Sequence, residues 1–252
     1  MPASSPIAVV TGASAGIGAA TGRALAGTGY RVVLGARRTE RIQELARELG
    51  GDAFPLDVTN PASIERFVTS VAQLAGRVDA LINNAGLALG LEPVADGKDE
   101  DWARMLNTNV LGLLRVTHAF LPLLRRAARA HIVNLGSVAG FEVYAGGAAY
   151  AASKHAVRAI SRTLRLELNG EPIRVTEIAP GMVETEFSLV RFKGDSERAA
   201  SVYHGLQPLT GADIADCIVW ALTRPAHVNI DELVVRPLAQ ASATTVHRVA
   251  SG

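Results

Sequence analysis

The sequence predicts a single-domain α/β fold, a doubly wound parallel sheet of about seven strands flanked by helices. Short runs rich in Val and Ile alternate with longer segments of helical period, as in repeated βαβ units. The short runs do not alternate polar with apolar residues, so each strand is expected to be buried on both faces. No linker, repeat or composition shift divides the 252 residues, and α/β folds commonly reach ~200–250 residues as one unit.

Seven short apolar runs are expected to form the strands of this sheet. In chain order they are Ile7–Thr11, Arg31–Ala36, Ala53–Leu56, Ala80–Asn83, His131–Leu135, Arg174–Ala179 and Glu232–Arg236. Because a helical segment separates most consecutive runs, the strands are expected to lie parallel.

Five longer segments have the period of helices. They are Gly18–Gly27, Thr39–Leu49, Ala62–Leu74, Asp101–Leu124 and Ala148–Leu168. In the second, Ile42, Leu45 and Leu49 share one face, and Asn60-Pro61 before the third provides an N-cap and a proline at the first helical position. The fourth is long enough for one bent helix or two joined ones.

Two irregular regions and a tail complete the domain, which spans residues 1–252. The regions lie at about Leu87–Glu100 and Met182–Leu209, and a fold of this type uses such segments as loops or lids. We expect the second, about 182–209, to be a substrate lid. The polar tail at about 237–252 is expected to reach a neighbouring subunit or to be disordered.

Charge and hydropathy exclude several classes of partner. The 25 Lys and Arg residues against 24 Asp and Glu give a net charge of +1, which argues against nucleic acid as a partner. The apolar runs are far shorter than the roughly 20 residues that cross a bilayer, so no membrane partner is expected. Residues 1–6 do not read as a signal peptide, so we expect a cytoplasmic protein.

Neither cysteine nor histidine indicates a metal or redox site. The single cysteine, Cys217, lies in an apolar stretch and is interpreted as a small core residue. None of the six histidines pairs with a ligand at zinc spacing, so no metal is predicted.

A glycine-rich turn follows the first strand and leads into a helix. It comprises Gly12, Ser14, Ala15, Gly16, Ile17 and Gly18. A dinucleotide pyrophosphate must approach backbone N–H groups at a helix N-terminus, and a β-carbon would block that approach. The strand, turn and helix therefore predict a dinucleotide site of Rossmann type, with a plain tight turn as the alternative.

Two arginines, Arg37 and Arg38, follow the second strand. An NAD site would place a carboxylate here for the ribose 2′-hydroxyl, whereas a 2′-phosphate calls for arginine. The pair therefore favours NADP as the cofactor. The alternative is two solvated residues that open a helix, where positive charge is unfavourable.

Three further residues form a candidate catalytic set. Tyr150 and Lys154 are four residues apart at the start of a predicted helix, so they share one face. A neighbouring ammonium favours the phenolate and lowers the tyrosine pKa from about 10. Ser137 follows the fifth predicted strand, where its hydroxyl would enter the ligand crevice, although a lone serine there is more often a cap.

Together these motifs resemble the short-chain dehydrogenase/reductase family over nearly the whole chain. The resemblance includes the turn Thr11 to Gly18, Asp57, Asn83-Asn84-Ala85-Gly86, Asn109, Ser137, Tyr150 with Lys154, and Pro180-Gly181 followed by Thr185. It implies Tyr150 as general acid/base, Lys154 as its pKa-lowering partner and ribose ligand, Ser137 as the group orienting the carbonyl, and Asn109 as support for a water relay.

The same resemblance assigns cofactor contacts. Asp57 would contact the adenine, the segment from Asn83 to Gly86 would line the cofactor, and Thr185 would hold the carboxamide. The cofactor site would also include Val58, Asn84, Ala85, Gly86, Pro180, Gly181 and Val183. Many NADP-dependent members carry a basic residue where this chain has Ala15, so its preference for NADP rests on Arg37 and Arg38.

The second half of the chain is similar to the NADP-dependent serine and 3-hydroxy acid dehydrogenases that also reduce malonic semialdehyde. The similarity lies in segments 144–147, 186–195 and 225–230. A small hydroxy acid needs a partner for its carboxylate, and we assign Arg191 to this role, with Tyr144 also at the substrate. Alternatively Arg191 pairs with Asp195 or with another subunit, and Glu142 would repel an anion unless it points away.

Other functions stay open at this stage. The first is a reductase of a larger uncharged ketone, aldehyde or specialised metabolite. The second is an NADP-binding sensor that has lost turnover, since fold does not imply function. Helices 101–124 and 148–168 carry excess apolar surface, and the family usually pairs on them, so a homo-oligomer is expected, either a dimer or a homotetramer.

Overall fold

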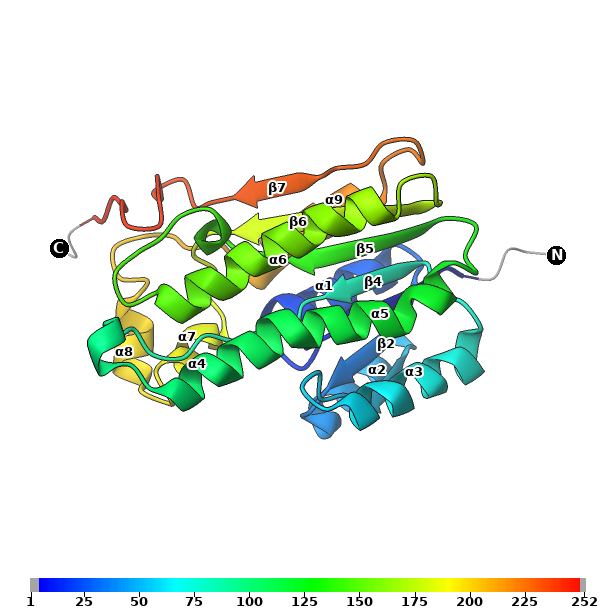
Figure 1. Cartoon of the computed structure of the whole chain (residues 1–252), viewed down its shortest axis with the longest axis horizontal. Helices are drawn as coiled ribbons and strands as arrows, with labels where there is room; N and C mark the ends of the chain where they lie inside the picture. Colours follow the sequence, from blue (N-terminus) through cyan, green and yellow to red (C-terminus); the bar gives the residue numbers. More distant parts are fainter. Residues whose placement is uncertain (1–4, 250–252) are drawn as a thin grey trace.

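The structure is a computed structural model that describes residues 5–249. Its centre is one parallel sheet of seven strands in the order β3-β2-β1-β4-β5-β6-β7 (Figure 1). The strands are β1 Ile7–Thr11, β2 Arg31–Ala36, β3 Asp52–Pro55, β4 Ala80–Asn83, β5 Ala130–Leu135, β6 Ile173–Pro180 and β7 Glu232–Val235. The predicted fold class is confirmed, and all seven predicted strands are present with ends within two residues of those expected.

Helices cover both faces of the sheet. One face carries α1 Gly16–Gly27, α2 Thr39–Leu49 and α9 Gly211–Leu222, which bury Leu25, Ile42 and Ile218. The other carries α3 Pro61–Ala75, α5 Leu113–Leu124 and α6 Ala148–Glu167, where Phe67 packs edge-to-face on Phe120. Each strand is therefore buried from both sides, as the unbroken apolar runs predict.

The predicted helix Asp101–Leu124 is one continuous helical segment with a widened turn. It consists of α4 Asp99–Leu106, a π-helical turn Asn107–Gly112 labelled η2, and α5. Such turns are frequent at functional sites because they re-aim the side chains around them. Here the turn holds Asn109.

Several elements differ from the sequence-based expectation. The predicted lid contains two short helices, α7 Glu186–Arg191 and α8 Ser196–Ser201. Helix α9 was not predicted, although Thr210 and Asp213 form a capping box at its start. Two 3₁₀ turns, η1 Val94–Asp96 and η3 Val138–Gly140, follow β4 and β5.

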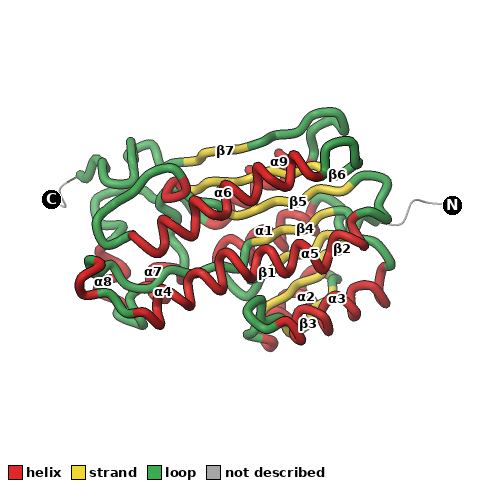
Figure 2. Tube along the Cα trace, viewed as in Figure 1, coloured by secondary structure: helices red, strands yellow, loops and turns green. Residues whose placement is uncertain are grey.

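The described part of the tail, residues 237–249, packs against its own chain. Val249 N–H donates to Gly205 O at 2.8 Å, and Arg248 donates to backbone carbonyls of the lid. The tail, the lid and the loops after β4 and β5 gather at one end of the molecule (Figure 2). This is the end toward which the strands run (Figure 1).

Within residues 5–249, no helix is both long and apolar enough to cross a membrane. Across the same residues, no cluster of three or more His, Cys, Asp or Glu side chains is arranged to hold a metal ion. Cys217 is only partly buried on α9, so it is not a full core residue.

Candidate active site

A cavity of about 640 Å³ opens at the carboxyl edge of the sheet, near the crossover between β1 and β4. Ligands of open α/β sheets bind at this position. Most of the predicted site residues line it. They are Gly12, Ala15, Gly16, Ile17, Arg38, Asn84, Ala85, Gly86, Ser137, Tyr144, Tyr150, Lys154, Pro180, Gly181, Val183, Thr185 and Arg191.

The glycine-rich turn is locked against the end of β4. The Thr11 hydroxyl accepts from the N–H groups of Asn84 and Ala85 at 3.1 and 3.0 Å, and the Asn84 amide donates to Thr11 O at 2.9 Å. Gly12 has φ +66°, and a Cβ there would lie 2.8 Å from Ala85 Cα. A side chain at this position is therefore excluded by both conformation and space.

The start of α1 provides donors for an anion. Its N-cap, Ala15, has no side chain that could accept from the first turn, and Ala15, Gly16 and Ile17 all line the cavity. The first N–H groups of a helix need acceptors, and the helix dipole favours negative charge there. This turn therefore fits a dinucleotide pyrophosphate.

Arg38 lines the cavity, whereas Arg37 does not. Arg38 Nε donates to Ser14 Oγ at 3.1 Å and Nη1 to Glu186 at 2.7 Å. Arg41, one helical turn further along, donates to the same carboxylate at 2.7 Å. Sequence reasoning missed Arg41, although its i, i+3 spacing from Arg38 places both on one face.

The catalytic set Ser137, Tyr150 and Lys154 meets on one wall of the cavity. Ser137 lies two residues after the end of β5 and caps η3, its hydroxyl accepting from Ala139 N–H at 3.2 Å. Tyr150 lies in the first turn of α6, and Lys154 Nζ is 5.9 Å from the centre of its ring. The buried lysine donates to Leu135 O at 2.7 Å.

Burial shifts the pKa values of Tyr150 and Lys154. Burial raises the pKa of Tyr150 above its usual 10, opposed by the charge of Arg191 and a hydrogen bond with Ser137. The lowering that the sequence predicts is therefore not found, and the cation that opposes the rise is Arg191, not Lys154. Burial also lowers the pKa of Lys154 to about 8, opposed by the charge of Glu177.

Arg191 points its guanidinium into the cavity from the end of α7. The guanidinium carbon, Cζ, lies 5.0 Å from the centre of the Tyr150 ring and 5.3 Å from the centre of the Phe187 ring. Nη2 donates to Tyr144 Oη at 3.0 Å. Its Nε is buried without a partner in the described chain. No ion pair joins it to Asp195 within residues 5–249, and Asp195 instead caps α8.

Some predicted residues lie outside the cavity. Ser14 lines a neighbouring hollow beside Arg41. Gly18 packs against the turn, since a Cβ there would lie 2.5 Å from Gly12 O. Asp57 accepts from Thr59 at 2.7 and 2.9 Å, and Val58 is buried in the core.

Two asparagines beside the site, Asn109 and Asn83, form hydrogen bonds within the protein. The Asn109 side chain exchanges hydrogen bonds with both backbone groups of Leu87 at 2.8 and 2.9 Å and donates to Ser153. It therefore ties the π-helical turn to the loop after β4. Asn83 was expected to line the cofactor, but it does not line the cavity. It is buried and donates to Thr117 and Asn134.

The tail closes one side of the cavity, which sequence reasoning missed. Gln240, Ala243 and Thr244 line it, and Gln240 Oε1 accepts from Met182 N–H at 2.9 Å. Glu142 accepts from Arg236 and from Ala243 N–H. Its charge is thus neutralised, which removes the expected conflict with an anionic substrate.

The family described as short chain dehydrogenase matches residues 6–194, more than half of the chain. The chain belongs to this family. An uncharacterized oxidoreductase of Mycobacterium tuberculosis is 56% identical over 238 residues, covering 94% of this chain and 93% of that protein. The NADP-dependent 3-hydroxy acid dehydrogenase YdfG of Salmonella typhimurium is 46% identical over 246 residues, covering 96% and 99%.

Solved structures of the short-chain dehydrogenase family agree with the fold. The closed form of serine dehydrogenase complexed with NADP+ is 45% identical, with TM-score 0.91, covering 96% of this chain and all of that one. Serine dehydrogenase from Escherichia coli is 40% identical, with TM-score 0.81, covering 93% and 99%.

Proposed function

We propose that this short-chain dehydrogenase is an NADP(H)-dependent oxidoreductase that interconverts the hydroxyl and carbonyl groups of a small 3-hydroxy acid or serine-like substrate. The observation that carries the proposal is a single cavity wall with Ser137, Tyr150 and Lys154, faced by the guanidinium of Arg191. The names of the relatives, an NADP-dependent 3-hydroxy acid dehydrogenase and a serine dehydrogenase, support the same substrate class.

The residues present fit NADP. The open start of α1 would take the pyrophosphate. Arg38 and Arg41 would hold the 2′-phosphate, for which planar guanidinium groups are well suited. When bound, NADP supplies hydride donor or acceptor chemistry.

The chain's own residues move the proton. In the oxidation direction, the phenolate of Tyr150 takes the proton of the substrate hydroxyl, which the Ser137 hydroxyl holds in place. The charge of Arg191 opposes the rise that burial causes in the Tyr150 pKa. The ammonium of Lys154, 5.9 Å from the ring centre, would also favour the phenolate. In reduction, Tyr150 returns the proton to the carbonyl oxygen.

Arg191 would bind the substrate carboxylate. Its Nε is buried without a partner, and an ionic hydrogen bond to a carboxylate would satisfy it. Tyr144 holds the guanidinium through its hydroxyl, and Thr185 caps α7 by accepting from Phe187 N–H at 3.2 Å. The lid thus fixes the distance between the carboxylate site and Tyr150.

The first experiment measures NADPH and NADH oxidation with malonic semialdehyde and with an uncharged aldehyde of similar size. We expect NADPH to be preferred and the carboxylate to be required. Activity with only the uncharged aldehyde would make the enzyme a reductase of uncharged carbonyl compounds, and no turnover despite NADPH binding would favour a sensor.

Replacing Arg191 by Ala tests the carboxylate site. We expect kcat/KM for malonic semialdehyde to fall about 10- to 100-fold more than for the uncharged aldehyde, because an ionic hydrogen bond contributes about 1.5–3 kcal/mol. The ratio is the readout, since Arg191 also influences Tyr150. Arg198→Ala, which alters a lid arginine stacked on Phe192 outside the cavity, serves as the control. An unchanged ratio in Arg191→Ala would exclude the carboxylate role.

The exposed apolar side chains of the helices support assembly into a homo-oligomer. Leu106, Leu111 and Leu114 are 41%, 44% and 39% exposed along the α4–α5 segment, and Leu166 on α6 is 79% exposed. Leu106 and Leu111 are five residues apart, and the π-helical turn Asn107–Gly112, with its i to i+5 hydrogen bonds, brings them toward the same face. Light scattering would give the mass, and a dimer or tetramer is the expected result.

A further inference from the structure

Glu177 is a buried carboxylate directly behind the catalytic wall. It lies in β6 opposite Asn134 of β5, and it is 1% exposed. Neither of its carboxylate oxygens has a hydrogen-bond partner in the described chain. A buried charge without a partner is costly, so such a group calls for a physical reason.

The surrounding backbone leaves space for this carboxylate. A Cβ at Gly136, the residue before Ser137, would lie 2.1 Å from Glu177 Oε1. A Cβ at Gly140 would lie 3.7 Å from the same oxygen and 3.0 Å from the backbone oxygen of Lys154. The carboxylate therefore occupies the hollow between the serine-bearing turn and the lysine-bearing helix.

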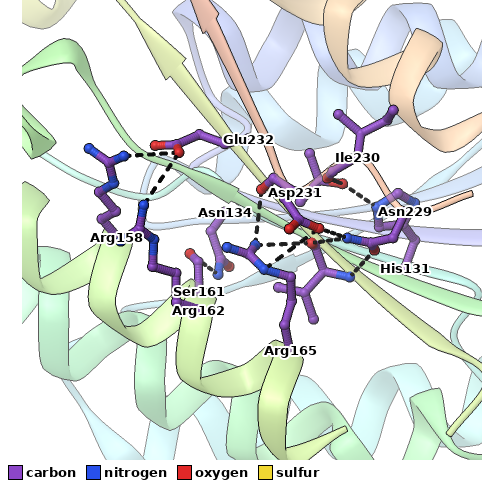
Figure 3. Close-up of polar contacts among 12 residues, drawn as sticks. His131, Asn134, Arg158, Ser161, Arg162, Arg165, Asn229, Ile230, Asp231 and Glu232 are labelled. Atoms are coloured by element: carbon purple, nitrogen blue, oxygen red, sulfur yellow. Dashed lines mark hydrogen bonds and ion pairs between the residues drawn. The ribbon is translucent and has the colours of Figure 1, made fainter. Parts of the chain in front are cut away.

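The arginines nearest to Glu177 already have other partners. Arg158 donates to Glu232 of β7 at 3.0 Å, and Arg165 donates to the backbone oxygens of Asp231 and Val175 at 2.9 and 3.3 Å (Figure 3). Lys154 differs, because its ammonium is buried and donates to a neutral carbonyl. Lys154 and Glu177 are thus opposite charges in one poorly hydrated layer between α6 and β6, where attraction is strong.

We propose that Glu177 is the buried counter-ion of Lys154 and keeps this lysine in its ammonium form. Glu177 touches neither substrate nor cofactor site and is therefore a positioning residue, one that sets the charge beside Tyr150. The consequence for catalysis rests on the roles given to Tyr150 and Lys154 in the proposed function.

The electrostatics of the cluster agree with this geometry. Burial lowers the pKa of Lys154 to about 8, and the charge of Glu177 opposes that fall. Burial and Glu232 of β7 raise the pKa of Glu177 to about 7, opposed by Lys154, Arg158 and Arg165 of α6. The facing residue of β5, Asn134, is neutral. Removing the carboxylate would therefore lower the lysine pKa further.

The test follows the ammonium of Lys154 directly. The chain has three lysines, Lys98, Lys154 and Lys193, so ¹³C-labelled lysine gives a spectrum in which the Lys154 signal can be assigned and titrated. In Glu177→Gln, we expect its midpoint to fall by about one pH unit or more, the size of one lost charge interaction. Glu177→Asp should keep the midpoint near that of the wild type, as should Glu48→Gln at an exposed ion pair.

An unchanged midpoint in Glu177→Gln would overturn the proposal. If that variant does not fold, the wild-type protein still decides, because the Lys154 signal must respond to the titration of Glu177 as well as to its own. A titration curve with no contribution from a second group would contradict the pairing.

Kinetics separate this inference from the proposed function. For alcohol oxidation, we expect the acid limb of kcat/KM in Glu177→Gln to move to higher pH, because a neutral lysine no longer favours the phenolate of Tyr150. If the Lys154 midpoint shifts but the acid limb does not, Glu177 is still the counter-ion of Lys154. That result would overturn the role of Lys154 in catalysis. A loss of thermal stability alone changes neither the Lys154 titration midpoint nor the acid limb of kcat/KM.

Discussion

Tyr150 is reached by two cations from different elements. Lys154 comes from the next turn of its own helix, and Arg191 comes from the lid. The phenol is otherwise packed against Phe187, with ring centres 5.7 Å apart. An apolar neighbour favours the neutral phenol and a nearby cation favours the phenolate, so we expect the proton transfer proposed for Tyr150 to depend on whether the lid is in place.

Replacing Tyr150 by Phe removes the proton donor and keeps the ring contacts. We expect turnover to fall at least about 10³-fold, within the range of general acid–base catalysis, while NADPH affinity stays near that of the wild type. Fluorescence titration of NADPH and steady-state rates measure the two effects. Tyr144→Phe, which removes another hydroxyl of the cavity, should raise KM more than it lowers kcat. Loss of NADPH binding in Tyr150→Phe would instead make Tyr150 structural.

At the residue scale, the sequence is enough to predict that Ser137, Tyr150 and Lys154 meet in the cavity but not which residues surround them. Tyr150, Lys154 and Ser137 could be predicted because the i, i+4 spacing and the end of a strand place them locally. Glu177 and Gln240 could not, since their importance depends on contacts with residues distant in the chain, such as Gly136 and Met182.

Helix α7 is fastened at both of its ends. At its start, Glu186 bridges Arg38 and Arg41 of the cofactor side. At its end, Arg191 stacks on Tyr150, and the Arg191 backbone oxygen accepts from Gly90 N–H at 2.9 Å. The lid therefore spans from the cofactor arginines to the substrate pocket.

Replacing Glu186 by Gln should loosen the start of this helix. We expect NADPH to dissociate about threefold faster, a modest effect because these ion pairs are half exposed. Stopped-flow displacement measures the rate. Arg47→Ala serves as the control, since Arg47 lies on the same helix as Arg41 and donates to the backbone oxygen of Gln43. Slower release would mean that Glu186 competes with the 2′-phosphate for the arginines instead of holding the lid.

The elements of the sheet could be predicted more fully than those around it. Strands buried on both faces are continuous apolar runs, which the sequence shows directly. Helix α9 could have been found from Thr210 and Asp213, whose side chains satisfy each other's backbone N–H groups. The short helices α7 and α8 have local N-caps at Thr185 and Asp195, but six residues are too few to show a helical period in the sequence.

At the scale of the whole molecule, one buried histidine links stability to pH. His131 of β5 is 2% exposed, and its Nε2 lies 2.7 Å from the hydroxyl of Thr176. Because that hydroxyl donates to Ile230 O at 2.6 Å, Nε2 must be the donor. The buried Nδ1 has no hydrogen-bond partner among the described residues, so a second ring proton would be unsatisfied and the neutral ring is favoured. Burial lowers the His131 pKa from 6.5 to about 3, with Arg174 contributing.

The sign of the effect follows from proton uptake. Between pH 6.5 and about 3, the unfolded chain binds a proton at His131 and the folded chain does not, so the free energy of unfolding falls by about 1.4 kcal/mol per pH unit as the pH decreases. His131→Phe should flatten this dependence in urea titrations at pH 7.0, 6.0 and 5.0. His118→Phe, at an exposed position on α5, should retain it. Equal slopes in His131→Phe and the wild type would rule out His131 as the cause.

The two ends of the described chain have opposite relations to the cavity. Ser5 leads into β1 at the amino edge of the sheet, whereas Val249 is bonded to Gly205 beside the lid (Figure 1). An enzyme attached to a bead or a fluorescent protein through its first residues would present an unhindered cavity to solution. Attachment through the last residues would put tension on the tail segment from Gln240 to Val249, part of which lines the cavity. For sensors or immobilised catalysts made from this chain, the N-terminal side is the one to join.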